Sequence, residues 1–337
     1  MKRLSKSTAT MITIVLVMCT FSPAPAAFAD SHTTEQASEA TTQKAVLVTG
    51  ASTGIGRKIT ELLASKGVFV YAGARKDSDL KELDAIENVK AIRLDVTIQE
   101  EIDAAVATIT KEGRGLYGLV NNAGVAILAP LIEVDEDELD FIFDVNIYGP
   151  YRITKAFSPL IITSKGRITT ISSISGILSS TLFGPYSMSK HAMEAYSDSL
   201  AREMERFDVK VSVVEPGNYE SEIGKTVKKR MEAKGIDIEG SPYQVELQGM
   251  MDRVGSGTPQ KDPQEVADAV YHALFDEKPK MRYMVVPNQR QAEITIGKAM
   301  EEMVQLNQDQ TYTFDRETLI KMLDETLAAT ATAGGAD

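Results

Sequence analysis

Short apolar runs alternate with stretches of helical periodicity through most of this sequence. Ala45-Val46-Leu47-Val48 is a continuous, largely β-branched run, as expected for a strand that is buried on both faces. Residues Ile55 to Ser65 place Ile59 and Leu63 on one face of a helix, which ends at Gly67. The same alternation predicts strands at 68–72, 91–94, 118–120, 167–171, 209–214 and 283–286, and helices at 102–111, 136–146, 151–162, 187–207 and 263–275. Strands that alternate with helices indicate an α/β fold, in which a doubly wound parallel sheet is covered by helices on both faces.

Two stretches interrupt this alternation. Residues 218–262 combine glycine, serine and charge at high density, and they follow the carboxyl end of a strand, where open α/β sheets bind ligands. We expect a mobile lid there, and an ordinary surface insertion is the alternative. Amphipathic patterns predict a helical extension at 291–327, and the small residues of 328–337 predict a disordered tail. The main domain is therefore expected at 43–290.

The N-terminus has the pattern of a targeting segment. A basic start precedes the apolar run Ala9–Phe21, and small residues flank a cleavable bond at Ala27-Phe28-Ala29. This pattern predicts a secretory signal peptide over 1–29, because the run is short for a membrane-spanning helix of about 20 residues. An uncleaved anchor and a mis-assigned start are the alternatives. If the signal is used, we expect the protein to be periplasmic, secreted or membrane-associated. If the start is mis-assigned, we expect it to be cytoplasmic. The polar segment 30–42 predicts a flexible linker.

Composition narrows the possible functions only a little. With 43% hydrophobic and 25% charged residues, the chain has the proportions of a globular protein. The formal charge of -12 argues against a broad surface for nucleic acid. Signal cleavage would remove Cys19, the only cysteine, and the three histidines stand far apart, so we expect no metal site.

The first strand runs into a glycine-rich loop of the kind that binds dinucleotides. Gly50 allows a sharp turn out of the strand, Gly54 lets backbone amides approach a pyrophosphate, and Gly56 allows the following helix to pack closely on the sheet. The position between a strand and a helix is the context that such a motif requires. The residues expected to bind the cofactor here are Thr49, Gly50, Ser52, Thr53, Gly54, Ile55 and Gly56.

The loop is spaced G-x-x-x-G-x-G, and further elements follow it in order. They are N-N-A-G at 121–124, Ser173, Y-x-x-x-K from Tyr186 to Lys190, and P-G at 216–217. Together they resemble the short-chain dehydrogenase/reductase family over roughly residues 44–290. Y-x-x-x-K alone is common, but the ordered set is not.

The resemblance implies roles for individual residues. It makes Asn146, Ser173, Tyr186 and Lys190 the catalytic set. Ser173 would orient the substrate oxygen, and Asn146 would fix a water in a proton relay. Further cofactor contacts are implied for Asp95, Val96, Asn122, Ala123, Gly124, Pro216, Gly217 and Ser221, beside Tyr186 and Lys190. Ser221 stands where the family usually has threonine. The resemblance also implies a homo-oligomer.

The residue types suit hydride chemistry at a carbonyl, which needs a proton donor at the oxygen. Tyr186 and Lys190 are one helical turn apart and share a face. A free tyrosine has a pKa of about 10, which is too high for an efficient base at neutral pH. We expect the Lys190 ammonium, together with the charge of an oxidised nicotinamide, to lower the pKa of Tyr186.

Cofactor choice depends on the end of the second strand. Enzymes that use NAD place an acidic residue there to accept hydrogen bonds from the ribose. This chain has Ala74, followed by Arg75, which can bind a 2′-phosphate. We therefore expect NADP to be favoured, with NAD possible.

The sequence thus predicts an NAD(P)-dependent oxidoreductase that interconverts a small-molecule alcohol and its carbonyl. A catalytically silent NADP-binding sensor or structural protein on the same fold is the alternative, although the complete Ser173, Tyr186 and Lys190 set argues against it. The substrate itself is not apparent from the sequence.

Overall fold

The computed structural model describes residues 43–235, 238–255 and 260–334. Residues 42–337 form one compact unit. The predicted signal peptide at 1–29 and the linker at 30–42 lie outside the described residues.

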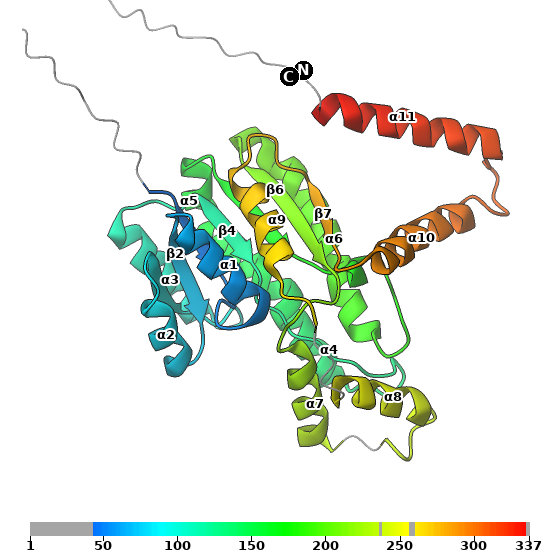
Figure 1. Cartoon of the computed structure of the whole chain (residues 1–337), viewed down its shortest axis with the longest axis horizontal. Coiled ribbons are helices and arrows are strands. Elements are labelled where there is room, and N and C mark those ends of the chain that lie inside the picture. The colour runs from blue at the N-terminus through cyan, green and yellow to red at the C-terminus, as the bar shows by residue number, and fades with distance from the viewer. Residues whose placement is uncertain (1–42, 236–237, 256–259, 335–337) are drawn as a thin grey trace, which may run out of the picture. The chain divides into compact units, whose positions relative to one another are not determined.

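A seven-stranded parallel sheet forms the centre of the fold (Figure 1). Its strands are β1 (Ala45–Val48), β2 (Phe69–Ala74), β3 (Val89–Arg93), β4 (Gly118–Asn121), β5 (Arg167–Ile171), β6 (Lys210–Pro216) and β7 (Arg282–Val285). They run in the order β3-β2-β1-β4-β5-β6-β7, and every neighbouring pair is parallel. The order reverses between β1 and β4, which is the point where open sheets of this kind bind ligands. The doubly wound fold predicted from the sequence is confirmed.

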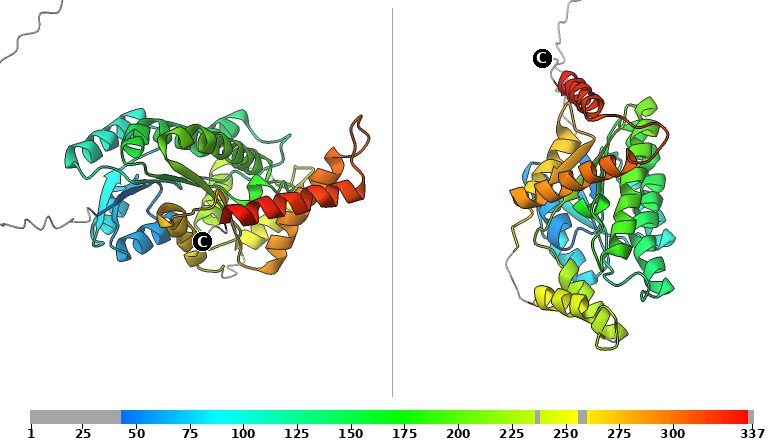
Figure 2. Two further views of the ribbon diagram at one scale, coloured as in Figure 1. Left: turned by 90° about the horizontal axis from the view of Figure 1, so that it is seen from above. Right: turned by 90° about the vertical axis from the view of Figure 1, so that its right-hand side faces the viewer.

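Helices cover both faces of the sheet, as the views in Figures 1 and 2 show. One layer holds α1 (Gly54–Ser65), α2 (Asp77–Asp84) and α9 (Gln264–Phe275), and the other holds α3 (Gln99–Glu112), α5 (Gly149–Thr163) and α6 (Gly184–Met204). Strand β1 explains why both layers form. Val46 and Val48 pack into the core beneath α1 and α9, whereas Ala45 and Leu47 pack into the core beneath α3 and α5. Burial of each such Val or Leu contributes about 1.5–3 kcal/mol.

The predicted helix at 136–146 is divided in the structure. Helix α4 (Glu136–Phe143) continues into a π-helical segment, η1 (Asp144–Tyr148), before α5 begins. The wider turn places Asn146 inside the protein, where its side chain is 2% exposed. Single π-helical turns are frequent at functional sites.

The stretch predicted as a lid contains two helices, α7 (Ile223–Lys234) and α8 (Gln244–Gly255). They have a small core of their own, separate from the two cores of the sheet. It is built from Ala126, Leu128, Leu182, Val227, Met231, Leu247 and Met250, with Tyr186 packed against it. Tyr186 of α6 (Gly184–Met204) therefore packs against the small core to which α7 and α8 contribute.

The C-terminal region is helical, with α10 (Gln289–Leu306) and α11 (Arg316–Gly334). The predicted disorder of 328–337 is wrong for 328–334, because α11 continues through them. Alanine is the best helix former, and the Thr330 hydroxyl donates a hydrogen bond back to the Thr326 carbonyl oxygen (3.1 Å). Residues 335–337 lie outside the described part. No helix in that part combines the length and the apolar character that crossing a membrane requires.

Candidate active site

The glycine loop between β1 and α1 leaves no room for side chains at two of its three glycines. Gly50 has a φ of +64°, and a Cβ there would lie 2.9 Å from the Cα of Ala123. A Cβ at Gly56 would lie 2.2 Å from the carbonyl oxygen of Gly50. The missing side chains therefore let the loop pack closely against itself and against the segment after β4, and the same loop lines the cleft described below.

Thr49 and Asn122 hold the loop against β4. The Thr49 hydroxyl accepts hydrogen bonds from the backbone N–H groups of Asn122 and Ala123, both at 3.0 Å. The Asn122 amide donates to the carbonyl oxygens of Thr49 (2.9 Å) and Gly50 (3.0 Å). These reciprocal bonds fix the shape of the loop before any ligand binds.

Ser173 and Tyr186 meet at the carboxyl end of β5. Ser173 is the second residue after β5, and its hydroxyl accepts from the Ser175 N–H at 3.0 Å. Tyr186 lies in the first turn of α6, and its hydroxyl is hydrogen-bonded to that of Ser173. A serine hydroxyl and a tyrosine hydroxyl therefore face the same point in the cleft.

Lys190 lies one turn after Tyr186 and is buried. Its ammonium donates to the Ile171 carbonyl oxygen (3.0 Å) and stands 5.6 Å from the centroid of the Tyr186 ring. A Cβ on Gly124 would lie 3.9 Å from the same ammonium. Lys190 thus bridges the end of β5 and the loop after β4.

Burial sets the titration of Tyr186 and Lys190 in the chain alone. Burial raises the pKa of Tyr186 to about 12, and the hydrogen bond with Ser173 only partly opposes this rise. Burial also lowers the pKa of Lys190 to about 8, against the opposing charge of Glu194. Desolvation disfavours the charged form of both groups in the chain alone, and the lowering expected from Lys190 together with an oxidised nicotinamide stays a prediction.

Asn146 acts through the backbone around it. Its Oδ1 accepts from the Val125 N–H (2.8 Å), and its Nδ2 donates to the Val125 carbonyl oxygen (2.9 Å) and the Ser189 hydroxyl (3.0 Å). These bonds tie the loop after β4 to helix α6. Asn146 therefore positions the segments that carry Gly124 and Lys190.

Arg75 and Asp95 form the opposite end of the site. Arg75 follows β2, and its Nη1 lies 3.6 Å from Oδ2 of Asp95, which follows β3. The Arg75 side chain is 62% exposed. Asp95 is held in turn by the Thr97 N–H (2.9 Å) and hydroxyl (2.7 Å). Ala74 is buried at the end of β2, so no carboxylate stands beside Arg75 at that position.

One cleft of about 280 Å³ brings the predicted residues together. Of the predicted cofactor and catalytic residues, those lining it are Gly50, Ser52, Thr53, Gly54, Ile55, Gly56, Arg75, Asp95, Val96, Asn122, Ala123, Gly124, Ser173, Tyr186, Lys190, Pro216, Gly217 and Ser221. Thr49 and Asn146 do not line it, and they support it through the hydrogen bonds described above.

Two groups of residues at the site were missed by sequence reasoning. The first is Gln291 at the start of α10, whose Oε1 accepts from the Asn218 N–H at 2.9 Å. A Cβ on Gly217 would lie 2.2 Å from that oxygen, so the helical extension closes directly on the P-G element. No local pattern signals this contact, because it joins residues far apart in the sequence.

The second group is an ionic cluster between α6, β6 and β7. Arg282 donates to Glu215 (2.6 Å) and Glu194 (2.8 Å) and pairs with Asp198 (3.3 Å). Glu215 is 1% exposed, and Glu194 lies one turn after Lys190. Burial and then the charge of Glu194 raise the pKa of Glu215 to about 8, while Arg282 opposes them. A glutamate directly after the apolar run of β6 was the available signal.

Comparisons with known proteins agree with this geometry. The family model for short chain dehydrogenases matches residues 44–232, more than half of the chain. The mitochondrial D-beta-hydroxybutyrate dehydrogenase of Mus musculus is 34% identical over 283 residues, which are 77% of this chain and 82% of that protein. The NADPH-dependent 3-dehydrocapnine reductase of Ornithobacterium rhinotracheale is 34% identical over 259 residues, covering 72% and 87%.

Among solved structures, a short-chain dehydrogenase from Streptomyces avermitilis has the same fold. Its TM-score is 0.66 at 31% identity, over 78% of this chain and 94% of that one. By both the family match and these relatives, the chain belongs to the short-chain dehydrogenase family of NAD(P)-dependent oxidoreductases.

Proposed function

We propose that this protein interconverts an alcohol and its carbonyl with NADP as the favoured cofactor and Tyr186 as the general acid and base. The observation that carries the proposal is the convergence of Ser173, Tyr186 and Lys190 on the cleft that the glycine loop also lines. A hydroxyl pair at one end and an exposed backbone loop at the other are the parts that hydride transfer to a carbonyl needs.

The residues present fit a nicotinamide dinucleotide. The glycine loop lines the cleft at the start of α1, and a Cβ on Gly54 would lie 3.4 Å from the Cα of Ser221, so this cradle suits a pyrophosphate. Arg75 would bind the 2′-phosphate, Lys190 the nicotinamide ribose and Ser221 the carboxamide. When bound, the nicotinamide donates or accepts the hydride, and its oxidised ring carries a positive charge.

Tyr186 holds the proton that moves to or from the substrate oxygen. Its raised pKa keeps the phenol protonated in the chain alone, which suits the donor role in carbonyl reduction. Ser173 shares a hydrogen bond with that phenol and can orient the same substrate oxygen. In alcohol oxidation the tyrosinate needs nearby positive charge, which Lys190 and the oxidised cofactor would provide.

Two observations support NADP over NAD. No acidic residue stands at Ala74 to repel a 2′-phosphate, and the Arg75 guanidinium lines the cleft beside Asp95. One relative is named as NADPH-dependent. We expect NAD to be used as well, because the Asp95 carboxylate partly neutralises the Arg75 guanidinium.

Tyr186→Phe tests the proposal most directly, because it removes one hydroxyl and keeps the ring. General acid-base catalysis contributes about 10²–10⁴-fold, so kcat should fall by at least about 100-fold while the Kd for NADPH changes little. Lys190→Ala should lower both kcat and the affinity for NADPH, because Lys190 is expected to bind the nicotinamide ribose as well as to assist Tyr186. Tyr196→Phe on the same helix is the matched control, because its hydroxyl meets the Pro150 carbonyl oxygen (3.5 Å) outside the cleft.

The measurement is oxidation of NADPH over a panel of ketones and aldehydes. A Tyr186→Phe protein that keeps most of its kcat would refute the mechanism. Tight NADPH binding with no turnover of any carbonyl would instead favour the silent sensor or structural protein.

A further inference from the structure

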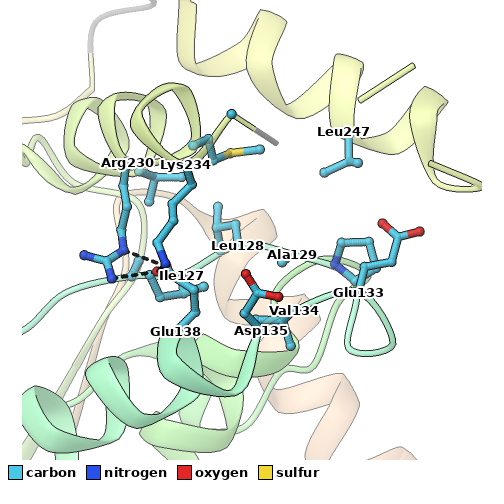
Figure 3. Close-up of a pocket in the computed structure, with 15 residues that line it drawn as sticks. Ile127, Leu128, Ala129, Glu133, Val134, Asp135, Glu138, Arg230, Lys234 and Leu247 are labelled. Atoms are coloured by element: carbon cyan, nitrogen blue, oxygen red, sulfur yellow. Dashed lines mark hydrogen bonds and ion pairs between the residues drawn. The ribbon is translucent and has the colours of Figure 1, made fainter. Parts of the chain in front are cut away.

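A second cavity of about 310 Å³ is lined by residues of α7 and α8 on one side and of α4 and the loop before it on the other (Figure 3). Ala126 lines both cavities. Leu128, Val227, Met231 and Leu247 line its apolar part, and they belong to the small core on which Tyr186 packs. The two cavities therefore share one wall residue, and Tyr186 packs against the core that lines the second cavity.

The pocket also contains an ionic cluster that links the lid to α4. Arg230 on α7 donates to both carboxylate oxygens of Glu138, at 2.6 and 2.7 Å. Lys234 lies 3.1 Å from Glu138 and 2.7 Å from Asp137. The Glu138 side chain is 11% exposed, and the hydrogen bond from Arg230 does most to hold its pKa below the usual range. Figure 3 shows both cations directed at this one carboxylate.

This arrangement pairs both cations of the described pocket lining with a carboxylate. Among the described residues that line it, Arg230 and Lys234 are the cations, and Glu138 engages both. Glu133 and Asp135 add two more carboxylates to the lining. A carboxylate on the substrate would have to displace Glu138 or lie beside like charges, and both are costly in a half-buried site.

We propose that Glu138 is a specificity-determining residue, which makes this pocket select substrates with an uncharged, apolar body and reject those that carry a carboxylate. The inference rests on the proposed function for the position of the carbonyl.

The test compares long-chain methyl ketones whose far end is a methyl group, a carboxylate or an ammonium group. With NADPH, kcat/KM for the methyl-ended ketone should exceed that of the carboxylate-ended ketone on the order of 100-fold, because like charges would otherwise be brought together. Equal use of the two ketones, or a preference for either charged one, would overturn the proposal.

Glu138→Gln should release Arg230 while keeping an acceptor of nearly the same shape. The ratio of kcat/KM for the carboxylate-ended ketone to that for the methyl-ended ketone should rise about tenfold. Glu133→Gln is the matched control, since it removes the same charge from the lining but accepts from the Ser241 hydroxyl rather than from a cation. Adding Arg230→Met to Glu138→Gln should abolish the gain. An equal rise in the Glu133→Gln protein would show a general field effect and refute the role of Glu138.

Binding keeps this inference separate from the proposed function. Calorimetric titration of the three ketones into the full-length Tyr186→Phe protein, with and without NADPH, reports selection without turnover. Tighter binding of the methyl-ended ketone supports the pocket assignment even if no ketone is reduced, which would count against the proposed function alone. Binding of the carboxylate-ended ketone as tight as that of the methyl-ended one would refute the pocket assignment whatever the activity.

Discussion

At the scale of single residues, cofactor preference depends on one cation and one missing carboxylate. Arg75 is 62% exposed and already lies 3.6 Å from Asp95. A bound 2′-phosphate would therefore have to share the Arg75 guanidinium with Asp95, in addition to displacing water from it. Because charge-assisted hydrogen bonds contribute about 1.5–3 kcal/mol, the expected preference for NADP is roughly 10–100-fold.

Substitutions at this position test the preference. Arg75→Ala should bring the Kd values for NADPH and NADH close together, and Ala74→Asp should reverse their order, because the new carboxylate repels the phosphate and accepts from the ribose. Fluorescence titration measures both Kd values. Lys76→Ala is the control, since Lys76 is also exposed but does not line the cleft. Tighter NADH than NADPH binding by the unaltered protein would contradict the assignment.

At the scale of elements, the predicted lid helices α7 and α8 bury fewer apolar side chains than the strands of the sheet do. In α7 only Val227 and Met231 are buried, and the apolar packing between α7 and α8 is the small core beside Tyr186. The remaining attachment of α7 is ionic, through Arg230 and Lys234. Segments with few buried apolar contacts open at low free energy.

Amide hydrogen exchange should show this difference. In the protein without ligands, α7 and α8 should exchange faster than β1 and β5, and NADPH together with a ketone substrate should slow their exchange. Helix α9, which packs on the sheet core through Val266 and Val270, is the internal reference and should change little. Slow exchange in α7 and α8 before any ligand is added would contradict the assignment of 218–262 as a mobile lid.

Differences in burial also explain which elements the sequence could predict and which it could not. The strands are continuous apolar runs because both faces of the sheet are buried, so β1 agrees with its predicted bounds of 45–48. Helix α2 was not predicted, because it is short and polar and buries only Leu83. The end of α11 was missed because small residues carry little periodicity, yet alanine favours helix strongly.

The residues of the site likewise fall into those that the sequence could predict and those that it could not. The residues predicted to contact a cofactor form local motifs, and the order of the strands brings most of them to one cleft. The cluster of Glu194, Glu215 and Arg282 could not be predicted in this way, because its members come from three separate elements and look like ordinary charges in the sequence. The raised pKa of Tyr186 depends on burial, which sequence spacing does not report.

At the scale of the whole molecule, this cluster joins β7 and β6 to the catalytic helix and links folding to pH. The native pKa of Glu215 is raised from 4.5 to about 8, so between these values the folded protein retains a proton that the unfolded chain releases. Stability from this group is complete below 4.5 and is lost as the pH rises toward about 8.

The free energy of unfolding should accordingly fall as the pH rises through this window, by at most about 1.4 kcal/mol per pH unit. Glu215→Gln removes the titrating group and keeps an acceptor for Arg282, so the unfolding free energy of this variant should depend less on pH across the same window. Urea unfolding followed by circular dichroism at several pH values measures both slopes. Glu87→Gln, at an exposed glutamate, should retain the slope of the unaltered protein. Equal slopes in the unaltered and Glu215→Gln proteins would show that Glu215 is ionised in the folded state, held there by Arg282 despite its burial.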